Sequence, residues 1–441
     1  MRKHLLTACL LGSLSFTALA DKQLASAVSS DYQQYLKKLF IHFHQNPEFS
    51  MAETQTSARI AKELTSVGFT VHENIAETGI VALMKNGNGP MVMMRADMDG
   101  LPIKEDSGLS YQSNATQKDP ITGKVSAVMH GCGHDVHITS LVGTARYMAA
   151  NKDKWSGTLM LIGQPAEERI MGARLMMEEN IWDKFGKPDY ALAFHVGASI
   201  ETGRINVNEG ATSAGSNSVD IIIHGVGTHG AYPHMGKDPI VLGSQIVMAL
   251  QTLVSRELPP KSPGVVTVGA FNSGSKHNII SDQAHLQITV RNTSLKTRDV
   301  LLSGIERIAT NLGRAAGLPE DKLPEVIISK DEGTPPTIND IAMTKRLKAV
   351  WRKAFGNSRV TDIEDPGMGA EDFSYFITEP LIPSVYWTVG GTPQADFDNA
   401  KNGGNPVPSH HSPFFKIDPD RSVPQGVEST VLALMELMGK K

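Results

Sequence analysis

The sequence predicts an α/β domain that is interrupted by a smaller α+β domain. Short apolar strands alternate with helical segments towards both ends of the chain, which is typical of a sheet covered by helices on both faces. In the middle third the expected order becomes β-α-β-β-α-β, the split arrangement of a ferredoxin-like domain. The length of 441 residues suits roughly two or three compact units.

The α/β domain is expected over residues 21–213 and 331–441, on either side of an inserted domain over residues 214–330. A helical pattern from Asp31 to Gly68 opens the first part and breaks at Asn46-Pro47. In the rest of the first part, strands are predicted over 79–85, 91–96 and 158–163 and a helix over 136–150. In the inserted domain, strands are predicted over 218–223, 264–271, 284–291 and 323–329 and helices over 239–258 and 298–316.

The first twenty residues have the pattern of an export signal. Arg2 and Lys3 precede an apolar stretch, and Ala18-Leu19-Ala20 forms a small-x-small cleavage site. We therefore expect export, to a bacterial periplasm, with cleavage after Ala20. Leu6-Thr7-Ala8-Cys9 offers an alternative, because it resembles a lipoprotein acylation box. No later segment approaches about 20 uninterrupted apolar residues, so no membrane span is expected.

Charge and cysteine content narrow the class of protein. With 42 basic and 46 acidic residues the chain is net negative, which gives no support to a nucleic-acid partner. Cleavage after Ala20 removes Cys9 and leaves Cys132 as the one thiol, so no intrachain disulfide is expected. A lone thiol in an exported protein is buried, paired between chains or bound to a metal.

Two segments place paired carboxylates after predicted strands. Asp97 and Asp99 follow one strand, at the kind of edge where α/β sheets carry their sites. Glu167 and Glu168 follow another strand, after Gln164-Pro165-Ala166. One glutamate of such a pair can bind a cation while the other holds the proton of an activated water. Local capping by the aspartates and a solvated surface for the glutamates are the alternatives.

A third segment, residues 129–137, concentrates metal-ligand residue types. Its sequence MHGCGHDVH contains Cys132 and three histidines, with glycines on both sides of the cysteine. Cys132 and His134 leave the same face of an extended loop and can converge on one metal. The segment also opens a predicted helix, whose N-terminal dipole favours a thiolate. His130 and His137 are either bystanders or supports for the ligands.

Isolated histidines add to these segments. His195 follows the apolar run Tyr190–Phe194, and the pair His410-His411 precedes Ser412-Pro413. A lone histidine after a strand is more often structural than a ligand, but three ligand-rich segments in one chain favour a metal site. Mixed histidine, carboxylate and thiolate ligands suit zinc or manganese, and a cysteine favours the softer ion.

The run GVGTHG at residues 225–230 has the spacing of a dinucleotide fingerprint and follows a predicted strand. Such a fingerprint must open a helix directly. Here residues 231–239 intervene, so no helix N-terminus meets a pyrophosphate, and nucleotide binding is not expected.

Seven motifs together resemble one family, the metallopeptidases and amidohydrolases that include aminoacylases, hippurate hydrolases and indoleacetyl-amino-acid hydrolases, with carboxypeptidase G as a more distant relative. The resemblance covers nearly the whole chain after the export signal. The motifs, in the family's order, are RADMDGLP at 95–102, MHGCGHDVH at 129–137, QPAEE at 164–168, AFHVG at 193–197, GTHGAYPH at 227–234, TPPTIND at 334–340 and GAEDFSYF at 369–376.

The resemblance implies a zinc-peptidase-like catalytic domain, an inserted lid that dimerises, and two divalent ions per subunit: zinc or manganese, with cobalt and nickel as alternatives. In relatives with a CGH motif the cysteine bridges both ions, a place that aspartate holds in more distant relatives. The ligands implied here are Cys132, His134, Glu168, His195 and His411, with His410 as the alternative to His411, and Asp97 and Asp99 are assigned to supporting positions behind them.

Roles in catalysis and substrate binding follow from the same resemblance. Glu167 matches the general base, and His229 matches a residue that stabilises the oxyanion, often across a dimer interface. Asn278 and Arg291 match lid positions that hold the substrate carboxylate. An arginine at a strand end can clamp a carboxylate through two charge-assisted hydrogen bonds.

We therefore expect a homodimeric, metal-dependent amidohydrolase that cleaves the amide bond of N-acyl amino acids, hippurate-like or related, or of small peptides. A metal-activated water would attack the carbonyl, and Glu167 would pass its proton to the leaving amine. The alternative is a periplasmic metal or solute carrier that keeps the fold without turnover. A carrier has no use for an unligated base beside its metal.

Overall fold

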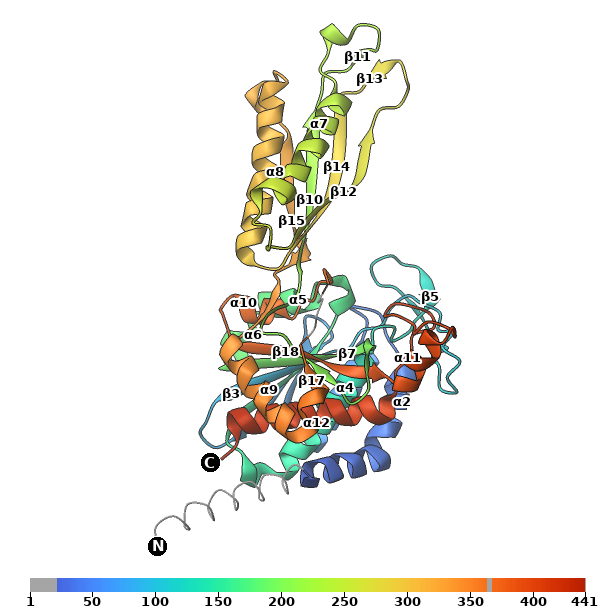
Figure 1. The fold of residues 1–441 in the computed structure, drawn as a ribbon, viewed down its shortest axis with the longest axis vertical. Coiled ribbons are helices and arrows are strands. Elements are labelled where there is room, and N and C mark those ends of the chain that lie inside the picture. The colour runs from blue at the N-terminus through green and yellow to red at the C-terminus, as the bar shows by residue number, and fades with distance from the viewer. Residues whose placement is uncertain (1–21, 363–366, 441) are drawn as a thin grey trace. The chain divides into compact units, whose positions relative to one another are not determined.

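The computed structural model describes residues 22–362 and 367–440, which divide into two compact units (Figure 1). The predicted export signal, residues 1–20, lies outside the described residues. Within them, no helix combines the length and apolar character needed to cross a membrane. Of the described residues, the α/β unit comprises 22–212, 339–362 and 375–440, and the inserted unit comprises 213–338 and 367–374.

In the described part of the chain, the α/β unit is built on an eight-stranded sheet of mixed direction, with the order β1-β2-β6-β3-β7-β18-β8-β17. β3 is parallel to β6 and β7, and β7 is parallel to β18, so these four strands end at the same edge. The strands are β1 (Thr70–Ile75), β2 (Gly79–Asn86), β3 (Met91–Asp97), β6 (Gly157–Gln164), β7 (Tyr190–Glu201), β8 (Ile205–Asn206), β17 (Val360–Thr361) and β18 (Ser384–Thr392).

Helices cover both faces of this sheet. α4 (His134–Ala150) and α12 (Pro419–Met438) lie together on one face, and α5 (Gly172–Glu178) and α6 (Ile181–Phe185) lie on the other (Figure 1). Four further helices pack around α4 and α12: η1 (Tyr32–Leu36), α2 (Lys37–Gln45), α3 (Thr54–Ser66) and α9 (Ile341–Phe355). The unit also includes the hairpin strands β4 (Thr116–Lys118) and β5 (Val125–Ala127) and the helices α10 (Ser374–Thr378) and α11 (Gln394–Lys401).

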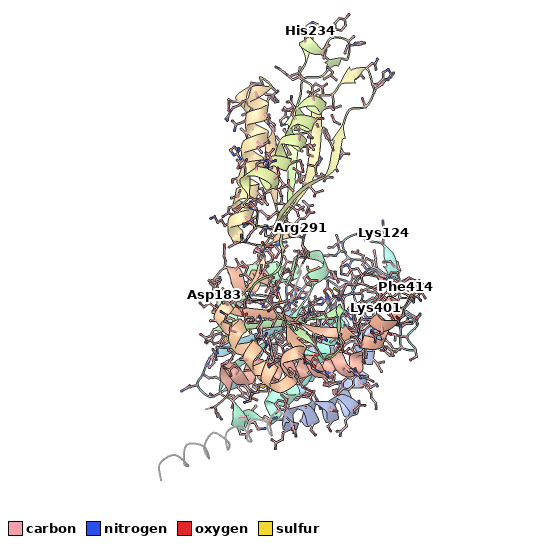
Figure 2. The ribbon with its side chains drawn as sticks, viewed as in Figure 1. Lys124, Asp183, His234, Arg291, Lys401 and Phe414 are labelled. Atoms are coloured by element: carbon pink, nitrogen blue, oxygen red, sulfur yellow. The ribbon has the colours of Figure 1, made fainter. Side chains whose placement is uncertain are left out.

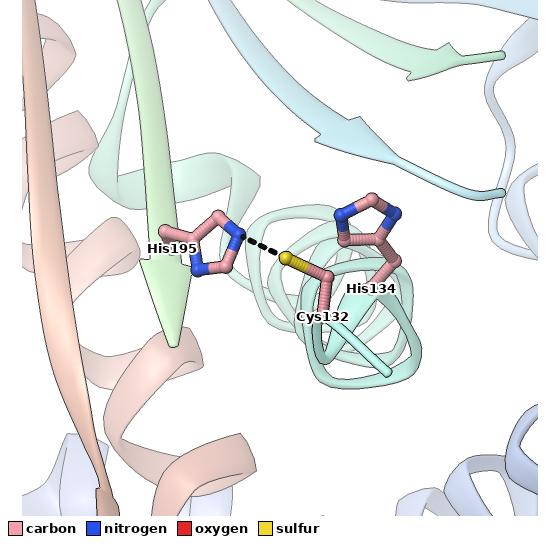
Figure 3. A group of neighbouring side chains, drawn as sticks. All are labelled: Cys132, His134 and His195. Atoms are coloured by element: carbon pink, nitrogen blue, oxygen red, sulfur yellow. Dashed lines mark hydrogen bonds between the residues drawn. The ribbon is translucent and has the colours of Figure 1, made fainter. Parts of the chain in front are cut away.

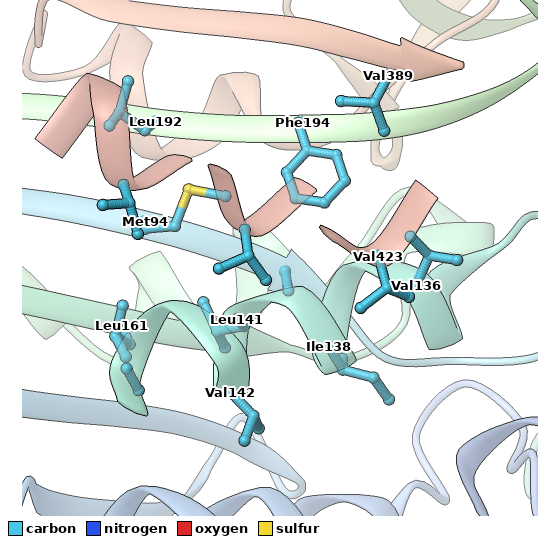
Figure 4. Close-up of a cluster of buried hydrophobic side chains, with 14 of the residues drawn as sticks. Met94, Val136, Ile138, Leu141, Val142, Leu161, Leu192, Phe194, Val389 and Val423 are labelled. Atoms are coloured by element: carbon cyan, nitrogen blue, oxygen red, sulfur yellow. The ribbon is translucent and has the colours of Figure 1, made fainter. Parts of the chain in front are cut away.

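The core of the α/β unit lies between α4 and the sheet (Figure 4). Leu141 of α4 is buried together with Leu161 of β6 and Phe194 of β7. Gly143 allows α4 and α12 to approach closely, because a Cβ at this position would lie 2.7 Å from the Val427 side chain of α12. This packing holds α4 against the strands whose ends carry the predicted site.

The inserted unit is a four-stranded antiparallel sheet with the order β12-β14-β10-β15, and its core is shared with two helices. A small pair of strands, β11 and β13, lies at one end of this unit (Figure 1). Its elements are β10 (Gly215–His224), β11 (Thr228–His229), α7 (Pro239–Thr252), β12 (Gly264–Ser273), β13 (Ile279–Ile280), β14 (Gln283–Asn292), α8 (Leu295–Ala315) and β15 (Glu325–Thr334).

The predicted fold class is confirmed, since an α/β sheet carries an insertion of β-α-β-β-α-β order. Two details differ from expectation. The helix expected over residues 239–258 is shorter, because α7 ends at Thr252 and Leu253–Glu257 continue as a wider helical turn. β15 runs past the expected domain boundary at residue 330, because its pairing with β10 continues to Thr334.

Candidate metal centre

Three of the predicted segments meet at the edge where β3, β6 and β7 end. Asp97 is the last residue of β3, which pairs with β6 on one side and with β7 on the other. His195 lies in β7, Glu167 and Glu168 follow β6, and α4 begins at His134. The topology therefore brings residues that are distant in sequence to one place.

Cys132, His134 and His195 face one another (Figure 3). Sγ of Cys132 lies 3.5 Å from Nε2 of His195, and one ligand atom from each residue lies within 4.8 Å of the others. Nδ1 of His195 lies 2.7 Å from the backbone oxygen of Val196, so we assign its proton to Nδ1, which leaves the Nε2 lone pair facing the thiol. Gly133 has a φ of +87°, which only glycine adopts freely.

His134 has one nitrogen held and the other directed into the site. Nδ1 lies 2.9 Å from the backbone oxygen of Asp99 and 3.2 Å from its carboxylate. Nε2 is buried and has no hydrogen-bond partner among the described residues. Burial alone would lower the pKa of His134, but Asp97 and Asp99 outweigh burial and raise the pKa to about 10. Without a metal, the site therefore favours the protonated, positively charged form of His134, and a bound cation could take the place of the proton on Nε2.

A tight turn projects Glu167 and Glu168 from the end of β6. Ala166 and Ile170, on either side of this turn, both have left-handed backbone, with φ of 51° and 53°. Such strain in residues other than glycine persists where the surroundings hold it, and it concentrates at functional sites. Hydrogen bonds hold the turn closed, because the N–H of Ile170 donates to the oxygen of Glu167 at 2.7 Å.

Glu168 connects this turn to the other potential ligands. Its backbone N–H donates to Oδ2 of Asp99 at 3.0 Å, and its Oε2 lies 3.4 Å from Nε2 of His411. Its Oε1 is buried, lies 3.9 Å from Nε2 of His134 and forms no hydrogen bond within the described residues. Burial raises the pKa of Glu168 to about 7, so a bound cation would favour its ionised form.

The adjacent histidines 410 and 411 have different surroundings. Nε2 of His410 accepts the backbone N–H of Ala198 at 3.1 Å, which occupies its lone pair. His411 has a left-handed backbone, with φ of 63°, and its side chain groups with Glu168 and Cys132. This geometry favours His411 as the ligand and His410 as a support.

The metal-free chain does not favour the Cys132 thiolate that the helix N-terminus led us to expect. Burial, with Glu168 and Glu167 nearby, raises the pKa of the Cys132 thiol well above its usual range. Burial and the two carboxylates thus outweigh the helix dipole, whose effect is modest. A cation is therefore needed to ionise the thiol.

The cluster as a whole fits divalent cations. Two groups of potential ligand atoms share the cysteine: Cys132 with His134 and His195, and Cys132 with Glu168 and His411. A shared thiol is the arrangement that a bridging ligand requires. Nε2 of His134 and Oε1 of Glu168 are buried and have no hydrogen bond within the described part of the chain, and ions would satisfy these two atoms.

Asp97 lies behind the potential ligands. It accepts a hydrogen bond from Arg95 at 2.7 Å through one oxygen and lies 2.5 Å from Nδ1 of His137 through the other. Nε2 of His137 accepts the N–H of Val196 at 2.9 Å. Asp97, His134 and His137 are also close enough to form a group of potential ligands, but these bonds already use Asp97 and His137. Asp97 and His137 therefore fix the strands around the site.

Sequence reasoning missed His44, a buried histidine of α2 that contacts the start of α4. His44 of α2 lies 2.7 Å from the carboxylate of Asp135 and 3.1 Å from that of Glu105. Burial alone would lower the pKa of His44, but hydrogen bonds to the two carboxylates raise it to about 9. Asp135, directly after His134, was the available signal, because a buried acid at this position needs a partner.

We expect His44→Gln to reduce the free energy of unfolding most below about pH 6.5. The folded-state pKa is raised above the unfolded value of about 6.5, so the stabilisation is complete below that pH and is lost as the pH rises through about 9. Denaturant titration of the metal-free parent and variant should show their difference shrinking over this range. His234→Gln, at an exposed position, is the control. A difference that stays constant with pH would contradict a charged His44.

Within the inserted unit, His229 and Asn278 are neighbours at one end. His229 is the last residue of β11, which pairs with β13. The N–H of the next residue, Gly230, donates to the backbone oxygen of Asn278 at 2.8 Å. The structure thus brings together two of the three substrate-facing residues predicted in this unit.

Arg291 lies far from that pair within the same unit. It is the penultimate residue of β14, and Figure 2 shows Arg291 and His234 at opposite ends of the unit. The stretch of β14 from Gln283 to Arg291 spans about 26 Å. The inserted unit of one chain therefore cannot place both Asn278 and Arg291 on one substrate carboxylate.

The chain is similar to known hydrolases along most of its length. The model of peptidase family M20/M25/M40 matches residues 93–431. A hippurate hydrolase of Campylobacter jejuni is 35% identical over 347 residues, which cover 78% of this chain and 86% of that protein. An IAA-amino acid hydrolase of Arabidopsis thaliana is 34% identical over 399 residues, which cover 90% of this chain and 84% of that protein. The solved structure of a Bacillus subtilis protein, described as a dinuclear metal binding peptidase from the M20 family, matches with a TM-score of 0.73 at 25% identity, covering 92% of this chain and 99% of that chain.

Proposed function

The chain belongs to peptidase family M20/M25/M40 and is a metal-dependent amidohydrolase, and from this premise we propose that it cleaves N-acyl amino acids with the help of two divalent ions. One observation carries the proposal: two groups of potential ligand atoms share Cys132, and Glu167 lies beside them. A shared ligand next to a carboxylate base suits hydrolysis of an amide bond.

The metal ions would be held by side chains that the fold already orients. Bound there, they would polarise the scissile carbonyl and lower the pKa of the attacking water. We propose zinc before manganese, because the set includes a thiolate. The chain's own contribution is to fix the direction of each ligand, as Asp99 does for His134 and as the backbone of Val196 does for His195. The proposed ligands are Cys132, His134, Glu168, His195 and His411.

Glu167 is assigned to proton transfer. Its Oε2 lies 3.9 Å from Nε2 of His134, at the border of the ligand group. We assign Glu167 to take one proton from the attacking water and to deliver it to the leaving amine as the C–N bond breaks. The products are a carboxylic acid and a free amine, so water is the only co-reactant.

The acyl group is proposed from the relatives, which are named for hippurate and for IAA-amino acids. We propose a hippurate-like N-acyl amino acid as substrate, with small peptides as the alternative. The test is a panel of N-benzoyl, N-indoleacetyl and N-fatty-acyl amino acids and dipeptides, with amine release measured after reconstitution with zinc or manganese. Bound ions with no amine release from any compound would favour a carrier instead.

We propose that the protein is a homodimer and that the inserted unit forms its interface. α7 exposes three apolar side chains, Ile240, Val241 and Met248, by 41%, 55% and 70%. β12 lies at the edge of its sheet, where a strand can pair with another chain. Because one inserted unit cannot place Asn278 and Arg291 on one substrate, we assign His229 and Asn278 to the site of the partner subunit and Arg291 to its own.

Two inactive variants should therefore restore activity when mixed. In a mixed dimer of Glu167→Gln and His229→Ala chains, one of the two sites would receive Glu167 from one chain and His229 from the other. Random reassociation gives about half mixed dimers with one intact site each, so roughly a quarter of the parent activity should return. Each variant alone is the control. Mixed dimers without activity would contradict a trans-acting His229.

We also propose that the protein is exported to the periplasm, on the sequence pattern of residues 1–20 alone. Protein recovered from the periplasmic fraction should begin at Asp21. A lipid-modified Cys9 at the N-terminus would show the acylation alternative instead.

A further inference from the structure

One short segment between α2 and α3 contacts both acidic motifs of the metal centre. The backbone oxygen of Glu48 accepts the N–H of Gly100 at 2.7 Å, and Oγ of Ser50 donates to Oδ2 of Asp99 at 2.6 Å. The end of this segment, Glu53, reaches the other motif, the turn after β6. Residues 48–53 thus lie under both strand ends that carry the site.

Glu53 is a fully buried carboxyl group that accepts hydrogen bonds from neutral donors. Oε1 accepts the backbone N–H of Ala166 at 2.8 Å, and Oε2 accepts the hydroxyl of Thr78 at 2.6 Å. Glu53 and Ala166 are both 0% exposed. Burying a carboxylate is costly, so its hydrogen bonds must be well made for it to be tolerated.

The bond from Glu53 fixes the residue that directly precedes the proposed base. Ala166 is left-handed, and its oxygen accepts the N–H groups of Met171 and Gly172 at 3.3 and 3.2 Å. Glu53 secures the N–H side of the same residue. Rotation of this peptide would move Glu167, whereas Glu168 has its own backbone anchor on Asp99.

We propose that Glu53 is a positioning residue for Glu167, holding the strained backbone of Ala166 in the conformation from which Glu167 faces the metal ligands. This inference rests on the proposed role of Glu167 as the base. Glu53 acts through Ala166 and does not touch the substrate. Its loss should therefore lower kcat while KM and metal content stay close to those of the parent.

Two conservative variants and one control test this proposal. Glu53→Asp keeps the carboxyl group but withdraws it by about 1.5 Å, one carbon–carbon bond. Glu53→Gln keeps the reach, since its amide oxygen can accept from Ala166 and its NH₂ can donate to Thr78. Thr78→Val removes the other hydrogen bond of the same carboxylate and leaves the Ala166 bond in place. The measurements are hydrogen–deuterium exchange of the peptide 164–171 in metal-free protein, metal content, kcat and KM.

Glu53→Asp should speed exchange of the Ala166 amide about tenfold and lower kcat about tenfold, whereas Glu53→Gln and Thr78→Val should stay within about threefold of the parent. Parent-like exchange and kcat in Glu53→Asp would overturn the proposal, as would a Thr78→Val variant equally impaired in kcat. Glu167→Gln separates the two ideas. If that variant were fully active, the base assignment would fail, and exchange of the Ala166 amide would still report whether Glu53 holds the turn.

Discussion

Replacing Glu167 by glutamine should lower kcat by about 10²- to 10⁴-fold while both metal ions stay bound. Glutamine keeps the size and polarity of the side chain but cannot take up a proton from water. The proposed ligands do not depend on its charge, since Glu168 is anchored separately through its N–H on Asp99. The measurements are kcat on the best compound of the substrate panel and metal content by elemental analysis.

The neighbouring carboxylate provides a matched control. Glu168→Gln should lose bound metal together with activity, because Glu168 is a proposed ligand and Glu167 is not. The contrast between two adjacent glutamates in one turn separates proton transfer from metal binding. A Glu167→Gln variant that turned over at the parent rate would refute the mechanism.

Replacing Cys132 by serine should remove at least one ion and lower activity by about 10³-fold. Both groups of potential ligands contain this thiol, so its loss affects both. A serine hydroxyl does not ionise near neutral pH, whereas a thiol does so when a cation is bound. Metal content after dialysis and kcat/KM report the two effects.

Cys132→Asp is the informative companion variant. A carboxyl group ionises far more readily than a thiol, and an aspartate holds the bridging place in the distant relatives that the sequence resembles. This variant should therefore retain more metal and more activity than Cys132→Ser. If serine and aspartate behaved alike, and both kept the parent metal content, Cys132 would not be a bridging ligand.

The strands that carry the site are predictable because each is a short apolar run that ends in polar residues. The sequence predicts β3 over 91–96 and β6 over 158–163, and the structure extends each by one residue at one or both ends. α12 is harder to predict, because Pro424 lies inside it and proline normally ends a helix. Pro424 lies in the first two turns of α12, and packing against α4 and β18 holds the rest of the helix.

The candidate ligands are predictable for a related reason. Most lie in local motifs, where spacing alone shows that several ligand types are close together. Contacts between distant segments leave no such pattern: Glu53 and Ala166 are 113 positions apart, and His44 and Asp135 are 91 positions apart. Each of these contacts supports the site, and each becomes visible only in the three-dimensional structure.

The sequence around Cys132 also predicts the wrong direction for the pKa shift of its thiol in the metal-free protein. The start of α4 suggests a lowered pKa for Cys132, but burial raises it, and Glu168 and Glu167 add to this effect from the turn that follows β6. Electrostatics depends on everything near a group in space, and a sequence window contains a small part of that.

The strand order of the α/β unit has a consequence for how the protein is made. β18 lies between β7 and β8, yet about 180 residues of chain separate β7 from β18 in the order of synthesis. At typical elongation rates a ribosome needs roughly 10 to 40 s to cover that distance. Throughout that interval β7 can pair with β3 on one side but is without β18 on the other. Most of the inserted unit, in contrast, is one continuous stretch that can collapse earlier. His411 emerges later still, so the ligand set is complete only after β18 and the segment that follows it have been made.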